Sequence, residues 1–162
     1  MPVDATTLVE WFEKSWNEAY HTPVARALEG LTAAQAFWKP APERHSAWQQ
    51  VMHMAYWREY FIRALEGNPA FPAEADLQAN NWPPHPEPAD DAAWAAARSR
   101  LEATQQRLVK LLRAMPPERL ERPAWGGEEP VALAIVHYMR HDSYHLGQIM
   151  LLRGLQGLPP LD

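Results

Sequence analysis

The stretch HDSYHLGQIMLLRG, residues 141–154, has the pattern of a buried helix that carries two histidines four residues apart. This spacing places both side chains on one helix face, about 5–6 Å apart at Cβ, which suits two ligands of one metal ion. Burying unpaired imidazoles is costly, and a bound metal removes much of that cost. His141 and His145 are therefore candidate metal ligands. From this stretch alone, the alternative of two polar residues tolerated in a helical core stays open.

Working outward from this stretch, hydrophobic periodicity predicts long helices and no convincing strand. The expected helices cover about residues 4–29, 46–66, 90–115 and 130–154. Thr22-Pro23 is expected to kink or restart the first of them, because threonine can cap a helix and proline fits its first turn. Ser46 and Gln49 form a capping-box pattern at the start of the second, and Gly67 is a suitable stop signal after it.

The lengths of the connections predict how these helices are arranged. The segment GNPAFPAEADLQANNWPPHPEPAD, residues 67–90, contains six prolines and little periodicity, so it is expected to be a loop of unusual length. It is long enough to return along a 20-residue helix, which measures roughly 30 Å. We therefore predict an all-α, up-down-down-up four-helix bundle with a long Pro-rich crossover between the second and third helices. One domain is expected over residues 1–162.

Composition limits the class of protein. Hydrophobic residues make up 47 % of the 162 residues and charged residues 22 %, which is typical of soluble globular proteins. No apolar run approaches the roughly 20 residues of a membrane helix, and the N-terminal residues lack the pattern of a signal peptide. A cytoplasmic protein is expected. The net charge of −5 argues against a nucleic-acid partner, and the absence of cysteine leaves His, Asp and Glu as metal ligands.

A third ligand is expected from the second helix. His53 lies roughly 10 Å from the start of that helix, and the His141–His145 pair lies roughly 12–19 Å from the end of the fourth. If these two helices are antiparallel, the three histidines lie at about the same depth. His137 extends the row on the fourth helix, but it is about 12 Å along the axis from His145, so all three cannot reach one ion.

The remaining histidines are weaker candidates. His21, His45 and His85 lie outside the predicted cluster. His45 precedes a predicted helix cap, and His85 lies in the Pro-rich segment. Both are expected to be solvated, although His85 could swing over the site.

Two stretches of this sequence resemble a known family. SAWQQVMHMAYW, residues 46–57, and HDSYHLGQIMLLR, residues 141–153, resemble the DinB/YfiT-like superfamily of four-helix metal proteins. The resemblance covers essentially the whole chain, including WKP at 38–40 and WGG at 125–127. The downstream stretch is fairly specific, whereas the upstream stretch alone would be a weak signal.

The resemblance implies an up-down-down-up bundle and one divalent ion bound by His53, His141 and His145, with His137 as a neighbour. The family includes transferases that use bacillithiol, mycothiol or glutathione, and a homodimer is a further expectation because dimers are common in it. It therefore implies a small-molecule substrate and a low-molecular-weight thiol as cosubstrate.

The chemistry of such a site points toward catalysis. Three neutral imidazoles leave a divalent ion with its full charge and an open coordination position, as in catalytic sites. Zinc or nickel fits an all-imidazole site best. We expect a metal-dependent thiol S-transferase of the bacillithiol type. The alternatives are a metal-dependent small-molecule hydrolase and a metal-stabilised binding or structural protein without turnover.

Five further residues are weaker site candidates. Asp142 makes HDSYH resemble the HExxH motif of zinc proteases, but aspartate is shorter than glutamate and too few residues follow to supply a third ligand. It is expected either to accept a hydrogen bond behind the metal ligands or to be a helix-surface acid. Gln148 either binds substrate or makes an ordinary helix contact. Trp57 and Tyr60 line the pocket or belong to the core, and Trp82 is expected to help cover the site.

Overall fold

The computed structural model describes residues 4–18, 22–125 and 127–161, and within these ranges it contains helices and no β-strand. His21 lies outside the described residues. The helices are α1 (Ala5–Lys14), α2 (Val24–Ala27), α3 (Ala33–Phe37), α4 (Ala47–Leu65), α5 (Glu74–Asn80), α6 (Asp91–Arg113), α7 (Pro117–Leu120) and α8 (Val131–Leu155). In this part of the chain, every helix is too short or too polar to span a membrane.

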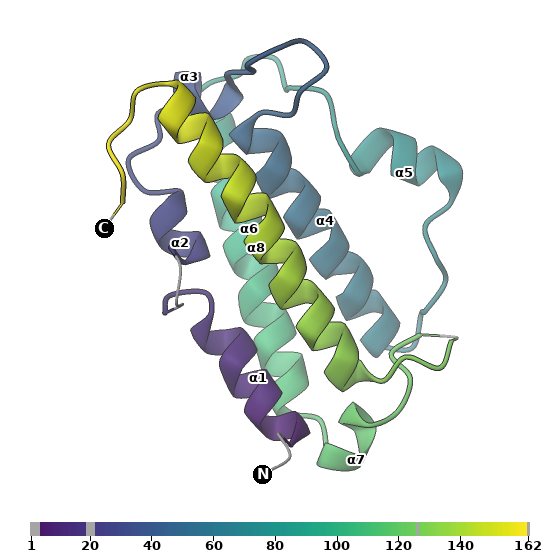
Figure 1. Ribbon diagram of the computed structural model, residues 1–162. Helices are drawn as coiled ribbons and strands as arrows, with labels where there is room; N and C mark the ends of the chain where they lie inside the picture. Colours follow the sequence, from purple (N-terminus) through teal and green to yellow (C-terminus); the bar gives the residue numbers. More distant parts are fainter. Residues whose placement is uncertain (1–3, 19–21, 126, 162) are drawn as a thin grey trace.

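The parallel arrangement of α4 and α6 is visible in their ion pairs. Arg100 on α6 binds Glu59 on α4 at 2.6 Å, and Arg107 binds Glu66 at the end of α4 at 2.7 Å. The partners are 41 residues apart in both pairs, so the two helices run in the same direction at a constant offset. The segment between them returns along the outside of the molecule (Figure 1).

The contacts between α4 and α8 show that these two helices are antiparallel, because residues later in α8 contact residues earlier in α4. The Tyr138 hydroxyl donates to the Trp57 carbonyl at 2.6 Å, and His145, later in α8, contacts Gln50, earlier in α4. In Figure 1, α1 and α8 ascend whereas α4 and α6 descend. The predicted all-α bundle is confirmed, and the described helices follow the up-down-down-up order.

The three longest helices agree closely with their predictions because each has strong boundary signals. Ser46 and Gln49 form the predicted capping box at the start of α4. The Asp90 side chain caps α6 by accepting a hydrogen bond from the backbone N–H of Ala93 at 2.9 Å. Helix α8 covers nearly the predicted range.

The prediction of one helix over residues 4–29 is wrong. Helix α1 ends at Lys14, and Ser15 follows it, with its hydroxyl donating to the carbonyl of Phe12 at 2.7 Å. Helix α2 begins at Val24 after Pro23, which agrees with the expected restart at Thr22-Pro23. The one-turn helices α3 and α7 were not predicted, because four or five residues are too few to show a helical period.

The Pro-rich crossover contains the unpredicted helix α5, so the expectation of a structureless loop is wrong there. Helix α5 has no buried residue, and a helix without an apolar face gives no periodic signal. It is joined to α4 by a hydrogen bond from the Tyr56 hydroxyl to Asp76 at 2.7 Å. This contact holds the end of α5, including Asn81, against α4.

The hydrophobic core has two parts along the bundle. One part includes Val51, Met54, Leu101 and Ile149, and the other includes Phe12, Phe61, Leu108 and Ile135. Each of α4, α6 and α8 contributes to both parts. The two parts therefore follow one another along the bundle axis, with an intermediate level between them.

A buried polar cluster occupies that intermediate level. Its members are Arg58, Gln105 and Asp142, from α4, α6 and α8, and we call it the Arg58 cluster. The Arg58 guanidinium donates to Asp142 at 2.6 Å and to Gln105 at 3.0 Å, while Arg58 itself is 0 % exposed. The cluster thus ties the three longest helices together in the middle of the bundle.

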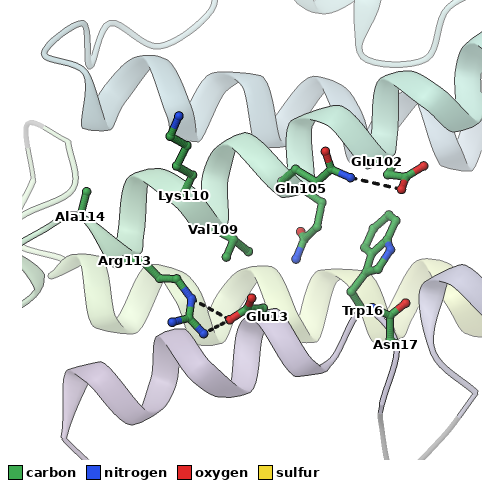
Figure 2. Close-up of a pocket in the computed structure, with 10 residues that line it drawn as sticks. Glu13, Trp16, Asn17, Glu102, Gln105, Val109, Lys110, Arg113 and Ala114 are labelled. Carbon is green, nitrogen blue, oxygen red and sulfur yellow. Dashed lines mark hydrogen bonds and ion pairs between the residues drawn. The ribbon is translucent and has the colours of Figure 1, made fainter.

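A polar hollow of about 670 Å³ lies between α1 and α6. Figure 2 shows its lining, which includes Trp16 and Gln105 and the ion pair between Arg113 and Glu13. None of the three histidines of the predicted metal site lines it. This hollow is therefore separate from the site described next.

Candidate metal centre

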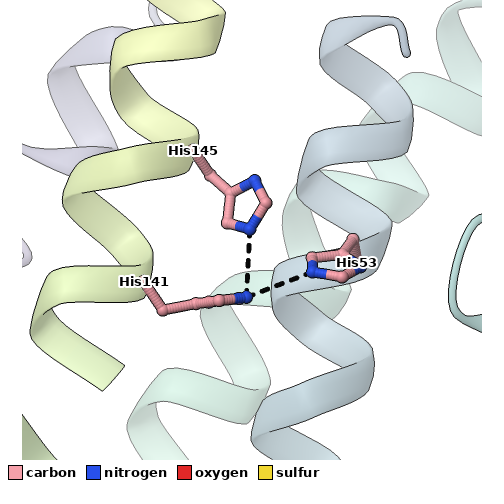
Figure 3. Close-up of side chains that lie close together, drawn as sticks. All are labelled: His53, His141 and His145. Carbon is pink, nitrogen blue, oxygen red and sulfur yellow. Dashed lines mark hydrogen bonds between the residues drawn. The ribbon is translucent and has the colours of Figure 1, made fainter. Parts of the chain in front are cut away.

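The structure brings His53, His141 and His145 together. His141 Nε2 lies 3.1 Å from His53 Nε2 and 3.0 Å from His145 Nε2. Figure 3 shows the three imidazoles pointing toward one another, one from α4 and two from α8. All three ligand atoms lie within 4.8 Å of one another, so the cluster could hold a metal ion.

Hydrogen bonds to the outer nitrogens fix the tautomers of two rings. His53 Nδ1 lies 3.0 Å from the backbone carbonyl of Asn81, which is an acceptor only, so Nδ1 carries the proton. His145 Nδ1 lies 2.5 Å from Gln50 Oε1 and donates to it in the same way. In neutral rings, both Nε2 atoms therefore present lone pairs to the centre of the cluster.

With these tautomers, the three Nε2 atoms share too few protons to make a hydrogen bond in both of their short contacts. A proton on His141 Nε2 can point at His53 or at His145, so one of the two short N···N contacts joins two lone pairs. A cation bound between the three rings removes this repulsion. Three nitrogens at zinc–nitrogen distances of about 2.0–2.1 Å in tetrahedral geometry would be about 3.3 Å apart. The two spacings of His141 Nε2, 3.1 and 3.0 Å, are close to this value, and all three atoms lie within 4.8 Å of one another.

Burial keeps the three histidines in the neutral form that binds metals. It lowers the pKa of His53 to about 4, with a smaller contribution from His45. The pKa of His141 is lowered to about 3, first by burial and then by His53 and Arg58. The pKa of His145 is lowered to about 2 by burial and by the neighbouring histidines and Arg58. At pH 7 the nitrogens are therefore free of the additional proton that would block coordination.

Sequence reasoning missed the two groups that orient the ligands. Gln50 precedes His53 by about one turn of α4 and is buried, so a polar residue on an apolar face was an available signal. Asn81 had no comparable signal, because it follows the unpredicted α5. Its backbone carbonyl accepts from His53, and its side-chain oxygen accepts from Trp57 Nε1 at 2.9 Å.

Trp82 lies over one side of the histidine cluster. Its ring stacks on His53 with a centroid separation of 3.9 Å and an interplanar angle of 12°. His45 stacks on the opposite face of Trp82 at 3.7 Å. His45 is thus half-buried in a three-ring stack, not solvated as expected.

Asp142 fits neither sequence interpretation. It is 6 % exposed, so it is not a helix-surface acid, and it accepts a hydrogen bond from Arg58 and not from a histidine. Burial raises the pKa of Asp142, while the adjacent Arg58 guanidinium opposes that rise. The side chain leaves α8 toward the centre of the bundle because Arg58 provides a buried charge partner there.

Two histidines outside the cluster have other partners. His137 Nδ1 lies 3.2 Å from Glu129, and its side chain is 48 % exposed. His85 Nε2 lies 2.8 Å from the Ser46 hydroxyl, and the ring packs edge-on against Trp48. The expectation that His85 is solvated or swings over the site is therefore wrong, since it is half-buried at the start of α4.

The three weaker pocket candidates line hollows beside the cluster. Trp57 lines a hollow together with His141, and Tyr60 lines the hollow that adjoins it. Gln148 is half-buried and lines a different hollow with Gln50. All three side chains thus border space near the histidines.

Gln50→Leu is expected to lower zinc affinity about 10- to 100-fold, because residues that orient a metal-binding histidine typically contribute that much. Leucine keeps most of the side-chain volume but cannot accept the proton of His145 Nδ1. Zinc affinity can be measured by competition with a chromophoric chelator. Gln148→Leu is the matched control and should leave affinity unchanged. Equal affinities in the two variants would show that the contact with Gln50 does not support the site.

Comparison with known proteins identifies the family. The family model of the DinB superfamily matches residues 7–149, a range that includes all three clustered histidines. A search of curated proteins and a search of solved structures found no match. Because the family match covers most of the sequence, this chain belongs to the DinB superfamily.

Proposed function

We propose that this protein is a metal-dependent thiol S-transferase of the bacillithiol type, with His53, His141 and His145 binding one zinc or nickel ion. The observation that carries the proposal is the convergence of three Nε2 atoms whose tautomers leave a shared space for a cation. An ion bound by three neutral imidazoles keeps its full charge and an open position, where it lowers the pKa of a thiol or of water.

The surrounding residues support the proposal by holding the three rings in place. Asn81 and Gln50 accept the Nδ1 protons, which directs both Nε2 lone pairs inward. Trp82 covers one face of His53 and excludes water from that side. These contacts keep the donor atoms oriented before any substrate enters.

Two separate hollows border the site, which favours a reaction with two substrates. One of about 690 Å³ is lined by Gln50, Gln148 and Arg44 among others, and another of about 310 Å³ by His141 and aromatic rings. They have no lining residue in common. The first has amide groups and charges of both signs, from Arg44 and Glu43, which suit the polar groups of a thiol cosubstrate, and the second has an apolar lining. A hydrolase of a single small molecule would need only one of them.

The test is a conjugation assay with bacillithiol and monochlorobimane on the zinc- or nickel-loaded protein. The thiol sulfur forms a bond to carbon, the carbon–chlorine bond breaks, chloride leaves and the thiol proton passes to the buffer. We expect a fluorescent conjugate that depends on the metal, and the same assay with mycothiol and glutathione defines the thiol.

Three results would contradict the transferase proposal in distinct ways. Conjugation at the same rate after chelation would exclude a role for the ion. Metal-dependent hydrolysis of an ester or amide panel without any thiol would identify a hydrolase. No turnover in either assay, together with a large loss of thermal stability on chelation, would identify a metal-stabilised binding or structural protein.

A further inference from the structure

A hollow lined by aromatic rings opens beside His141. It has a volume of about 310 Å³ and is lined by Trp57, His137, Tyr138 and His141. Of the clustered histidines, His141 is the one that lines it, so the cavity reaches the edge of the proposed metal site. Its size lies at the lower end of the range for small-molecule pockets, which are also mostly apolar.

This first hollow continues into an adjoining hollow with more aromatic rings. This second hollow, of about 500 Å³, shares Trp57, His137 and Tyr138 with the first and adds Tyr60, Phe71 and Trp125. The Phe71 ring lies 5.9 Å from Trp57 and 5.6 Å from Tyr60, and Tyr60 lies 5.8 Å from Trp125. Together the two hollows form one aromatic-lined space, which we call the aromatic cavity.

Phe71 at the rim of this cavity is exposed. Its exposed fraction is 64 %, although two aromatic rings flank it. A large exposed apolar side chain next to an apolar cavity is typical of a binding surface. Phe71 therefore provides a wall that a planar ligand can complete by stacking.

Two polar groups of the walls, on Tyr138 and Trp57, are already paired. The Tyr138 hydroxyl donates to the Trp57 carbonyl, and Trp57 Nε1 donates to Asn81. Glu129 Oε1 lies 3.2 Å from His137 Nδ1, and His141 Nδ1 is buried without a hydrogen-bond partner among the described residues. The described lining residues include no lysine or arginine, so an anionic ligand would meet Glu129 without a compensating arginine or lysine.

We infer that the aromatic cavity binds the uncharged, planar aromatic part of the electrophile, with the reactive atom next to His141. This inference rests on the proposed transferase function and specifies its acceptor substrate. The hollow of about 690 Å³ lined by Gln50 and Arg44 is then left for the thiol. Discrimination between acceptors comes from stacking in the cavity and from the exclusion of anions.

The test uses 1-naphthol as a probe, with the zinc-loaded protein and no thiol, and calorimetry to measure binding. Phe71→Ala is expected to weaken 1-naphthol binding about 2- to 12-fold, the range for one aromatic contact. Trp11→Ala is the matched control, because Trp11 is an aromatic residue on α1 that is 49 % exposed. It should leave binding unchanged. Zinc content should be unaffected in both variants.

Two additional measurements locate the probe and test its charge. In cobalt-loaded protein, the paramagnetic ion should broaden the NMR signals of bound 1-naphthol, because the cavity borders the metal site. The two probes are also compared on the metal-free protein, because a bound zinc ion would itself attract a carboxylate. There the anion 1-naphthoate should bind at least about tenfold more weakly than 1-naphthol, since the anion loses hydration without gaining a cationic partner. Absent binding, binding without cobalt broadening, or equal binding of the two probes would each overturn the inference.

A failure of the acceptor-site inference can be distinguished from a failure of the proposed transferase function. Binding of 1-naphthol does not require a thiol or turnover, so it can succeed in a protein that conjugates nothing. Conversely, metal-dependent conjugation of monochlorobimane in a protein that does not bind 1-naphthol would retain the transferase and reject the aromatic cavity as the acceptor site.

Discussion

The His53→Ala variant is expected to lose the stoichiometric ion, with zinc affinity reduced more than about 100-fold. Removing a ligand should cost more than removing a residue that orients one, which costs about 10- to 100-fold. His53 is the one member of the cluster on α4, so its loss leaves two nitrogens from a single helix. Elemental analysis of purified protein should find one ion per chain in the parent and far less in the variant.

The same variant should also lose its stabilisation by zinc. A ligand present at 100 times its dissociation constant stabilises a folded protein by about 2.7 kcal/mol, and a 100-fold weaker site loses most of this. Thermal unfolding with and without zinc therefore gives a readout independent of activity. The parent should show a clear increase in Tm on zinc addition, and His53→Ala should not.

His137→Ala is the matched control for this experiment. His137 lies one turn before His141 on α8, but its side chain is 48 % exposed and contacts Glu129. Its replacement should leave zinc content and the zinc-dependent Tm unchanged. Retention of one ion with unaltered affinity in His53→Ala would show that the three histidines do not act as one site.

The second large effect is expected from Arg58→Met, which should destabilise the protein by about 3–5 kcal/mol. Arg58 is 0 % exposed and donates to Asp142 at 2.6 Å. Methionine keeps the aliphatic part of the arginine side chain and lacks the guanidinium, so the main loss is the charge partner of a buried carboxylate. Guanidinium unfolding of the metal-loaded protein, with the slope compared between variants, measures this difference.

Two comparisons separate the buried charge from other consequences of the substitution. Arg107→Met removes an ion pair with Glu66 in which the side chains are 60 % and 42 % exposed, and should cost at most about 1 kcal/mol. In the double variant Arg58→Met/Asp142→Leu the orphaned carboxylate is gone, so stability should recover substantially. A loss for Arg58→Met no larger than that for Arg107→Met would contradict the importance of the buried pair.

Local signals were sufficient to predict the long helices and the approximate level of the histidines. The capping box at Ser46 and the strong periodicity of the later segments determine the main boundaries. The length of the crossover then indicated that the helices bearing His53 and His141 run antiparallel. The structure places these histidines together, while their binding of an ion stays a prediction for the experiments above.

The parts that could not be predicted depend on contacts between distant segments. Helix α5 buries no side chain, so its sequence has no apolar stripe, yet it positions Asn81 against His53. Arg58 and Asp142 are 84 residues apart, and each alone resembles an ordinary charged helix residue. Their pairing becomes apparent once α4 and α8 are packed, because only burial makes each residue require the other.

The Arg58 cluster also determines how α4 and α8 are aligned at the proposed metal site. The Arg58–Asp142 pair joins the same two helices, α4 and α8, that carry the three histidines. Sliding one helix past the other by a single turn would move it about 5.4 Å. That displacement exceeds the 3.0 and 3.1 Å separations of the Nε2 atoms and would separate the buried charges as well. The ion pair thus locks the axial register of α4 and α8, so the three histidines are held at matching positions for the proposed ion.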